Sequence, residues 1–359
     1  MYECRACGRS YGVTATAPWR CDCGHPLDYA ALSLSGDQPP DTDRDRGLWT
    51  FDSALPVDRR VTLGEGWTPL AEAPDWGATF KLEYLFPTGS FKDRGAAVML
   101  SQAAALGVDR VLEDSSGNAG AAVATYAARA GIDAEIYVPA DVKAGKLRAI
   151  ERAGADVVRV EGDRQAVTDA CLDAVDDAGW YASHAWNPAF FAGTATVAFE
   201  IATQRDWTAP DAVVTPLGHG TLFLGAYRGF RLLAEAGWIE AVPRLYGAQA
   251  AGVAPLVADR HGEAAAAGSN AAADGIQITE PARREQLRAA IEDSGGGAVA
   301  IDGATTRDHL DRLHRSGFYT EPTCAVAPAA LERLREDSEI GAGEDVVVAL
   351  TGTGLKTDG

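Results

Sequence analysis

Short β-type runs alternate with alanine-rich helical runs from about Val61 to the C-terminal end of the chain. The predicted strands are Thr79–Glu83, Arg110–Glu113, Ala134–Val138, Asp156–Val160, Ala212–Thr215, Arg244–Ala248 and Asp345–Leu350. Helices such as Ala119–Ala130, Ala144–Ala153 and Arg164–Ala178 are predicted between them. This alternation predicts an α/β fold with mainly parallel sheets covered by helices on both faces. In such folds ligands bind beside the carboxyl ends of the strands.

The chain has 359 residues, more than one typical domain, which predicts two or three folding units. Residues 1–34 read as a small cysteine-containing module and residues 61–359 as the main body. Between them, residues 35–60 are polar, with a Pro-Pro pair and the charged run Asp41–Arg46, and read as a linker. The end of this linker, Leu48–Phe51, is apolar enough to pack on the body.

The N-terminal module contains two close cysteine pairs, Cys4 with Cys7 and Cys21 with Cys23. Four thiolates arranged in this way suit a tetrahedral Zn²⁺ ion, and a small module without a core of its own depends on metal to fold. The second pair is one residue shorter than the usual spacing, so His25 is a weaker alternative ligand. Four filled positions leave none open, which predicts a structural zinc site.

Lys92 is the most informative single residue of the main body, because only five lysines occur in a chain otherwise rich in arginine. It follows Gly89 and Ser90 and precedes an apolar run that reads as a buried helix. A lysine becomes a nucleophile when desolvation lowers its pKa. The competing interpretation is an ordinary basic residue in the first turn of a helix.

Two glycine-containing loops each follow a predicted strand and precede a helix. The loop Ser115–Gly120 presents backbone N–H groups and hydroxyls that suit a carboxylate, although it also reads as a simple helix cap. The loop Leu217–Gly225 suits a phosphate, and its spacing is not that of a dinucleotide-binding fingerprint.

Four blocks in this order carry a resemblance to a known family. They are Leu63–Leu70 (LGEGWTPL), Pro87–Gly95 (PTGSFKDRG), Ser115–Gly120 (SSGNAG) and Leu350–Lys356 (LTGTGLK). The chain resembles the threonine synthase family of fold type II pyridoxal-phosphate (PLP) enzymes, which share the tryptophan synthase β-like fold. Archaeal-type members often carry an N-terminal zinc ribbon.

The resemblance implies a catalytic domain of two α/β subdomains with PLP between them, the smaller spanning roughly residues 95–191. It implies that Lys92 holds PLP through a Schiff base and acts as general base. The other implied PLP contacts are Asn118 at the phenolic oxygen, Gly218, His219, Gly220 and Thr221 at the phosphate, and Thr351 at the pyridine nitrogen. The implied substrate contacts are Thr88, Ser90, Ser115, Ser116 and Gly117.

The activity implied is that of a carbon–oxygen lyase acting on phosphates, which converts O-phosphohomoserine and water to threonine and phosphate in amino-acid biosynthesis. Departures from the family pattern leave an alternative. Phe190 stands where members typically carry Arg, Ala195 where they carry Lys, and Ala119 and Gly120 replace two hydroxyl residues. A threonine or serine ammonia-lyase, or a cysteine synthase-like β-replacement enzyme, needs no phosphate pocket. A non-catalytic protein that binds a partner through its zinc ribbon is a third hypothesis.

The net charge of −19 constrains partners and location. An acidic surface repels nucleic acids and anionic membranes, so neither is expected as a partner. The sequence shows no signal peptide and no apolar run of the ~20 residues that span a bilayer, which predicts a cytoplasmic protein. The expected partner is a small amino-acid substrate, and related enzymes are often homodimers.

The excess of Asp and Glu, with lysine largely replaced by arginine, also predicts a halophilic protein. Salt screens the mutual repulsion of these carboxylates, so we expect the melting temperature to rise when KCl is added. Thermal melts at increasing KCl concentration measure this directly. A melting temperature that falls with added KCl would exclude salt adaptation.

Overall fold

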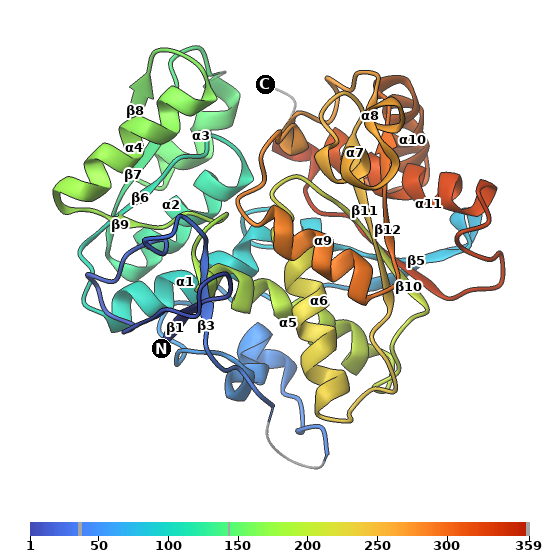
Figure 1. The fold of residues 1–359 in the computed structure, drawn as a ribbon, viewed down its shortest axis with the longest axis horizontal. Coiled ribbons are helices and arrows are strands. Elements are labelled where there is room, and N and C mark those ends of the chain that lie inside the picture. Colours follow the sequence, from blue (N-terminus) through green and yellow to red (C-terminus); the bar gives the residue numbers. More distant parts are fainter. Residues whose placement is uncertain (35–37, 143, 357–359) are drawn as a thin grey trace.

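The structure is a computed structural model that describes residues 1–34, 38–142 and 144–356, with two lobes visible in Figure 1. The start of the predicted linker, residues 35–37, and Lys143 lie outside the described residues. The helices that cover the sheets are α1 (Lys92–Ala105), α2 (Asn118–Ala130), α3 (Ala144–Arg152), α4 (Arg164–Ala178), α5 (Pro188–Gln204), α6 (Thr221–Glu235), α7 (Pro255–His261), α8 (Glu263–Ala266), α9 (Arg284–Asp293), α10 (Gly303–Arg315) and α11 (Val326–Glu336).

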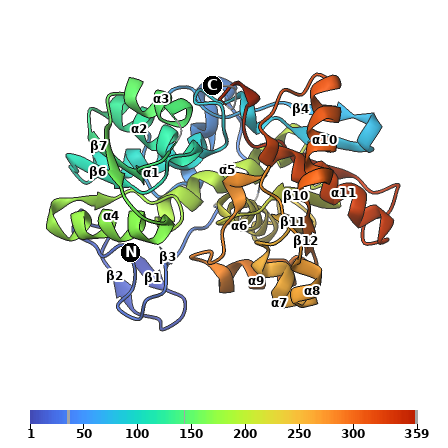
Figure 2. The ribbon, with the colours of Figure 1, turned by 90° about the horizontal axis from the view of Figure 1, so that it is seen from above.

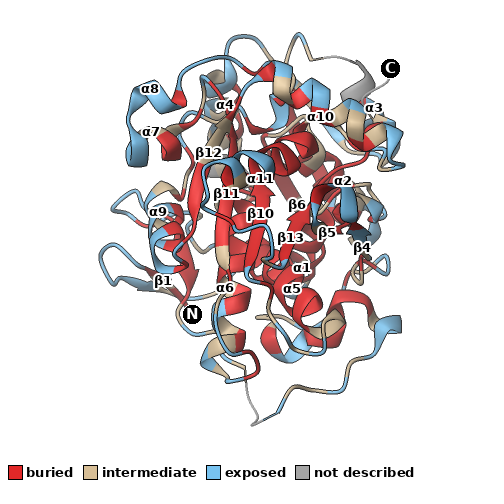
Figure 3. Ribbon diagram, turned by 90° about the vertical axis from the view of Figure 1, so that its right-hand side faces the viewer, coloured by how far each residue is buried: buried red, intermediate tan, exposed pale blue. Residues whose placement is uncertain are grey.

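The larger lobe is built on a six-stranded sheet. Its order is β12 (Gly297–Ile301), β11 (Arg244–Ala250), β10 (Ala212–Pro216), β13 (Val346–Ala349), β5 (Ala78–Lys81) and β4 (Leu70–Ala73). All neighbours are parallel except the edge pair of β4 and β5. The central strands are apolar and buried from both sides, as Figure 3 shows, which explains their runs of valine.

The smaller lobe contains a fully parallel sheet of four strands. Its order is β8 (Asp156–Val160), β7 (Asp133–Pro139), β6 (Arg110–Glu113) and β9 (Trp180–Tyr181). The two sheets and their helices confirm the predicted α/β class, and each strand predicted from the sequence is present with small shifts at its ends. The sequence prediction missed the short strands β4 and β9 and also β12, whose Gly-Ala-Val-Ala-Ile run lies in a glycine-rich stretch and is weak in strand-forming residues.

A third, antiparallel sheet of β2 (Ser10–Tyr11), β1 (Tyr2–Cys4) and β3 (Leu27–Tyr29) forms the N-terminal module (Figure 2). This module is anchored on the body. The hydroxyl of Tyr2 lies 3.2 Å from the side-chain oxygen of Gln102 in α1, and Arg283 donates to Asp28 at 2.7 Å.

The second half of the predicted linker is part of the body. Residues Arg44–Ala54 form short 3-10 turns (η1), and the Leu48, Trp49 and Phe51 side chains are buried. The indole N–H of Trp49 donates to Glu65 at 2.8 Å. Burial of the apolar Leu-Trp-Thr-Phe run therefore fixes this segment on the body, although charged residues precede it. Four further 3-10 turns are Pro74–Trp76, Glu83–Leu85, Asp274–Ile276 and Pro322–Ala325, and a last one covers Gly354–Lys356. No described helix is both long and apolar enough to cross a membrane.

A fully buried ionic network joins α1 and α5 to the large sheet. Arg94 donates to Glu83 at 2.7 Å and to Glu200 at 2.6 Å, and the Lys81 ammonium donates to Glu200 at 2.9 Å. Burial opposes the ionisation of Glu200, but Arg94 and Lys81 outweigh it and lower the pKa of Glu200 to about 2. Since this pKa lies below its ordinary value, Glu200 stabilises the fold above that value, and the contribution is lost as the pH falls toward about 2.

Replacing Arg94 with Met should destabilise the protein strongly, because two buried carboxylates would share the single cation of Lys81. We expect a loss of about 3–5 kcal/mol in the free energy of unfolding. The matched control is Arg333→Met, which removes an exposed pair with Asp337 and should cost no more than about 1 kcal/mol. Urea unfolding of both variants gives the comparison, and equal losses would contradict it.

Candidate active site

Three predicted site residues are the first residues of helices. Lys92 begins α1, Asn118 begins α2 and Thr221 begins α6. The first N–H groups of a helix have no partner within it and carry partial positive charge. These helix starts come from both lobes, so the junction of the two lobes suits an anionic ligand.

Direct contacts bring the predicted cofactor residues together. The Lys92 ammonium lies 3.4 Å from the hydroxyl of Thr221, at the glycine loop. The backbone N–H of Phe91 donates to the carbonyl oxygen of Thr351 at 3.1 Å, and Ser90 forms a β-bridge with Gly352. The C-terminal segment therefore lies against the loop that carries Lys92.

The environment of Lys92 favours the neutral amine. Burial lowers the pKa of Lys92 to about 8, against the opposing effect of Glu113 and Glu321. The lowered pKa increases the fraction of unprotonated amine near neutral pH, and the unprotonated amine is the form that attacks a carbonyl.

The loop before α6 forms a backbone cradle. Gly220 has φ of 73°, and a Cβ atom there would lie 2.4 Å from Leu287. A Cβ atom on Gly218 would lie 3.0 Å from the backbone of Ile276. Glycine at both positions lets the backbone N–H groups approach a ligand. Together with the nearby Lys92 and Thr221, this cradle fits the phosphate and aldehyde of PLP.

The loop Ser115–Gly117 is partly exposed and leads into α2. The hydroxyl of Ser115 accepts the backbone N–H of Gly117 at 3.3 Å. A Cβ atom on Gly120 would lie 1.8 Å from the Ser115 carbonyl oxygen, so this loop conformation requires the glycine that replaces the family's hydroxyl residue. Ser116 lies between them, also partly exposed.

The side chain of Asn118 has two partners. Its amide nitrogen donates to Glu321 at 2.9 Å, and its oxygen accepts from Lys356 at 3.0 Å. Lys356 closes the fourth sequence block, and its contact with Asn118 was not predicted.

The hydroxyl groups of the remaining predicted site residues differ in whether they already have a hydrogen-bond partner. The Thr88 hydroxyl donates to Asp93, which also accepts the Thr88 backbone N–H at 2.9 Å. The hydroxyl of Ser90 is buried and has no partner among the described residues. The Thr351 hydroxyl lies 3.4 Å from the Cys324 sulfur, which also accepts the N–H groups of Thr351 and Gly352.

Sequence reasoning missed a buried cluster beside Lys92, formed by Glu113, His184 and the side chain of His219. Glu113 ends β6, and its carboxylate lies 2.7 Å from His184 Nδ1 and accepts the His184 backbone N–H at 3.1 Å. The two imidazole rings meet edge to face with centroids 5.3 Å apart. The acidic pair Glu113-Asp114 before the Ser115 loop was the only available signal, because His184 lies 71 residues away.

Phe190 and Ala195, which replace the family's cations, are buried in α5. The Phe190 ring lies over Gly95 of α1, where an added Cβ atom would come within 2.3 Å of it. Its centroid lies 5.8 Å from the Lys92 ammonium and 6.0 Å from the His184 ring. An aromatic wall therefore stands where an arginine would supply charge.

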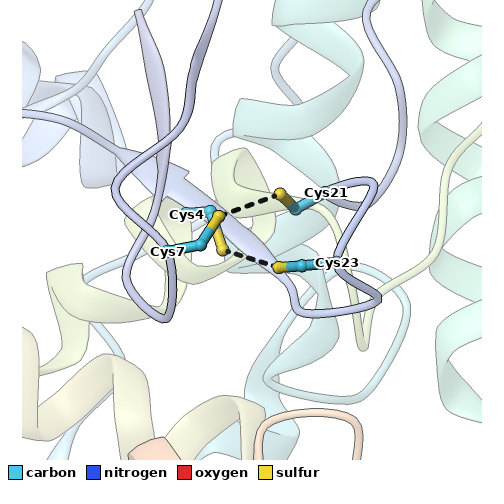
Figure 4. A group of neighbouring side chains, drawn as sticks. All are labelled: Cys4, Cys7, Cys21 and Cys23. Carbon is cyan, nitrogen blue, oxygen red and sulfur yellow. Dashed lines mark hydrogen bonds between the residues drawn. The ribbon is translucent and has the colours of Figure 1, made fainter.

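The four N-terminal cysteines converge, as Figure 4 shows. The Cys4 and Cys23 sulfurs are 3.5 Å apart, as are those of Cys7 and Cys21, and all four lie within 4.8 Å of one another. Zn–S bonds of ~2.3 Å in a tetrahedron place sulfurs about 3.8 Å apart, so the cluster fits zinc. All four thiols are free, and His25 Nδ1 lies 3.5 Å from the Cys23 sulfur and 3.2 Å from its carbonyl oxygen.

Comparison with known proteins gives a consistent result. The profile of the family described as "Pyridoxal-phosphate dependent enzyme" matches residues 61–352. The threonine synthase of Methanocaldococcus jannaschii is 31% identical, and the match covers 99% of this chain and 93% of that protein. The threonine synthase of Mycobacterium bovis is 35% identical, with 82% of this chain and 83% of that protein covered.

Solved structures share the fold. Threonine deaminase isoform 2 from Solanum lycopersicum has a TM-score of 0.70 at 20% identity and covers 96% of this chain and 95% of its own. An L-serine ammonia-lyase from Rhizomucor miehei has a TM-score of 0.67 at 23% identity and covers 80% and 93%. At these identities the likeness concerns the fold alone.

Proposed function

Because this chain belongs to the threonine synthase family of pyridoxal-phosphate-dependent enzymes, we propose that it converts O-phosphohomoserine and water into threonine and phosphate. The observation that carries the proposal is the placement of Lys92. Its buried amine, with a lowered pKa, begins α1 within 3.4 Å of the threonine that begins α6. The relatives that share the whole length of the chain support the choice of reaction.

Each residue then has a role that follows from its position. Lys92 binds PLP, which supplies an electron sink for carbanions next to the substrate nitrogen. The backbone of Gly218, His219 and Gly220 and the hydroxyl of Thr221 hold the cofactor phosphate. With substrate bound, the amine of Lys92 would remove protons from Cα and Cβ, and it would return one to Cγ and one to Cα.

Other residues orient the reactants. The N–H groups and hydroxyls of Ser115, Ser116 and Gly117 bind the substrate carboxylate. Asn118 and Thr351 orient the cofactor ring, and the neutral hydroxyl of Thr351 favours elimination and replacement over transamination. Ser90 supplies an unpaired buried hydroxyl at the base of Lys92, whereas the Thr88 hydroxyl is bonded to Asp93 and serves the loop.

A second candidate is an ammonia-lyase or β-replacement enzyme acting on serine or threonine. The observation that favours it is the buried aromatic Phe190 and the buried Ala195 at the positions of the family's cations. A hydroxyl leaving group needs no cation.

The N-terminal module is proposed to bind a structural Zn²⁺ through Cys4, Cys7, Cys21 and Cys23. The acidic composition supports a halophilic protein, and the biosynthetic role proposed supports a cytoplasmic location. The proposed oligomeric state is a homodimer, because related enzymes are often homodimers.

Product analysis tests the proposed reaction. The PLP-loaded protein in high KCl should convert O-phosphohomoserine to threonine and phosphate, both followed by NMR. Lys92→Ala should abolish turnover and the absorbance of bound cofactor, because it removes the amine proposed to bind PLP. The control Arg333→Met removes an exposed cation of α11 that is paired with Asp337, and it should retain the absorbance.

Serine and threonine are given separately to the same preparation. A 2-oxo acid and ammonia from these substrates, with O-phosphohomoserine untouched, would replace the synthase with an ammonia-lyase. Turnover by Lys92→Ala would refute the role of Lys92.

Metal analysis tests the zinc site. The purified protein should contain about one zinc per chain, and Cys23→Ser should lose most of it, because a hydroxyl is a poor ligand at neutral pH. His25→Ala is the matched control and should retain zinc. Zinc retained by Cys23→Ser and lost by His25→Ala would assign His25 as the fourth ligand instead.

A further inference from the structure

Elimination of phosphate from O-phosphohomoserine has a requirement that Lys92 alone does not meet. When the Cγ–O bond breaks, its electron pair goes to a phosphate oxygen. That oxygen is strongly basic unless it receives a proton as it leaves, so a general acid at this position accelerates the step. Lys92 is occupied with the proton of Cβ at that moment.

The cluster beside Lys92 has the composition of such an acid. Glu113 is fully buried, and one of its oxygens faces His184 Nδ1 at 2.7 Å while the other accepts the His184 backbone N–H. Because Glu113 engages Nδ1, Nε2 is the nitrogen through which His184 would contact a ligand. Phe190 lies about 6 Å from both the His184 ring and the Lys92 ammonium, so the three groups share one wall.

We propose that Glu113 and His184 form a proton relay that protonates the leaving phosphate, with His219 as a second contact to it. This assignment rests on the proposed function and names the leaving-group side of the same site. His219 fits the second role because its Nδ1 is buried without a partner among the described residues and its ring packs on His184.

Protons and electron pairs are conserved through the elimination of phosphate and the addition of water. Lys92 takes the Cβ proton, the electron pair forms the Cβ–Cγ double bond, and the Cγ–O bond breaks toward phosphate. His184 Nε2 gives its proton to the leaving oxygen while Nδ1 takes the proton of Glu113. Lys92 then returns the Cβ proton to Cγ. The hydroxyl of a water adds at Cβ while its proton passes through His184 to Glu113, and the proton removed from Cα at the start is returned to Cα. The net change is one water consumed and one phosphate released.

The surroundings agree with a relay that holds one transferable proton. Burial and the neighbouring Asp114 raise the pKa of Glu113 well above its ordinary value. Burial and Lys92 keep the pKa of His184 well below its ordinary value and lower that of His219 to about 3. The charged groups that face the cluster are Lys92 from α1, Asp114 after β6 and Arg164 from α4, and Arg164 is itself paired with Asp114 at 2.8 Å. Both shifts favour a proton on the carboxyl group of Glu113 over a second proton on the His184 ring.

The relay also accounts for the missing cations. A fixed arginine would bind the phosphate in its charged form but has no proton to give, because its pKa is too high. A neutral acid–imidazole pair contributes a proton at the moment of bond breaking. Phe190 and Ala195 keep the wall apolar, which strengthens the hydrogen bonds of the relay.

The test compares two esters on the PLP-loaded holoenzyme. O-phosphohomoserine has a leaving group that needs a proton, and O-sulfohomoserine has the same shape but leaves as a weakly basic sulfate. Glu113→Gln keeps a hydrogen bond to Nδ1 but carries no acidic proton. We expect kcat for the phosphate ester to fall about 100-fold or more, and kcat for the sulfate ester to fall less than about threefold. His184→Gln should show the same pattern, and Glu135→Gln, on the neighbouring strand β7, should change neither.

Equal losses on the two esters would overturn the relay and leave Glu113 with a structural role. A second measurement is independent of turnover. Infrared spectra of the holoenzyme at neutral pH should contain the carbonyl stretch of a buried protonated carboxylic acid that is absent from Glu113→Gln. If that band is missing from the wild type, the relay is wrong. If the wild type makes no threonine from the phosphate ester, the proposed function is wrong, and the infrared result still decides the protonation of Glu113.

Discussion

The buried charges around Arg94 fix the geometry on which the site depends. Arg94 lies two residues after Lys92 on α1, and it binds Glu83 beside the large sheet and Glu200 on α5. Charges without water require partners in defined directions, so this network has one low-energy arrangement. The first turn of α1, and with it the amine of Lys92, is thereby held against the large lobe. A hydrophobic contact at the same place would tolerate rotation of the helix, whereas forked hydrogen bonds from a guanidinium do not.

Close helix packing extends this constraint to α6. A Cβ atom on Gly193 would lie 2.1 Å from the carbonyl oxygen of Arg94, so α5 approaches the backbone of α1 directly. Gly229 of α6 meets the Ala195 carbonyl in the same way, at 2.4 Å. The three helices therefore pack closely at glycines, and this packing brings the start of α6 close to Lys92. Glycines at these positions let the helix backbones touch. This contact fixes where the loop before α6 lies relative to Lys92.

The sequence predicted what depends on local chain order. Where a strand is followed by a glycine-containing turn and a helix, the local sequence predicts where the helix begins and where its first N–H groups lie. The loops at Ser115 and Gly218 and the lysine that begins α1 were located in this way. It did not predict contacts between distant segments. Glu113 and His184 are separated by 71 residues, and Lys356 reaches Asn118 across 238. Such pairs are set by how β6, β9 and the C-terminal segment are brought together, which no local pattern encodes. Nor did the sequence show that the hydroxyl of Thr88, a predicted substrate contact, donates to Asp93 within its own loop.

The N-terminal module is linked to the segment that carries His184 through Arg283, and not through its cysteines. Arg283 is fully buried, and it donates to Asp28 and to the Leu27 carbonyl oxygen of the module. It also donates at 2.6 Å to the carbonyl oxygen of Trp186, two residues beyond His184. Loss of the module would leave the Arg283 guanidinium buried with fewer acceptors, at a cost that only a local rearrangement relieves. The segment that must move is the one that carries His184. Through Arg283 the module therefore supports the segment that carries His184, and Asp28, which makes this contact, lies on strand β3 of the module.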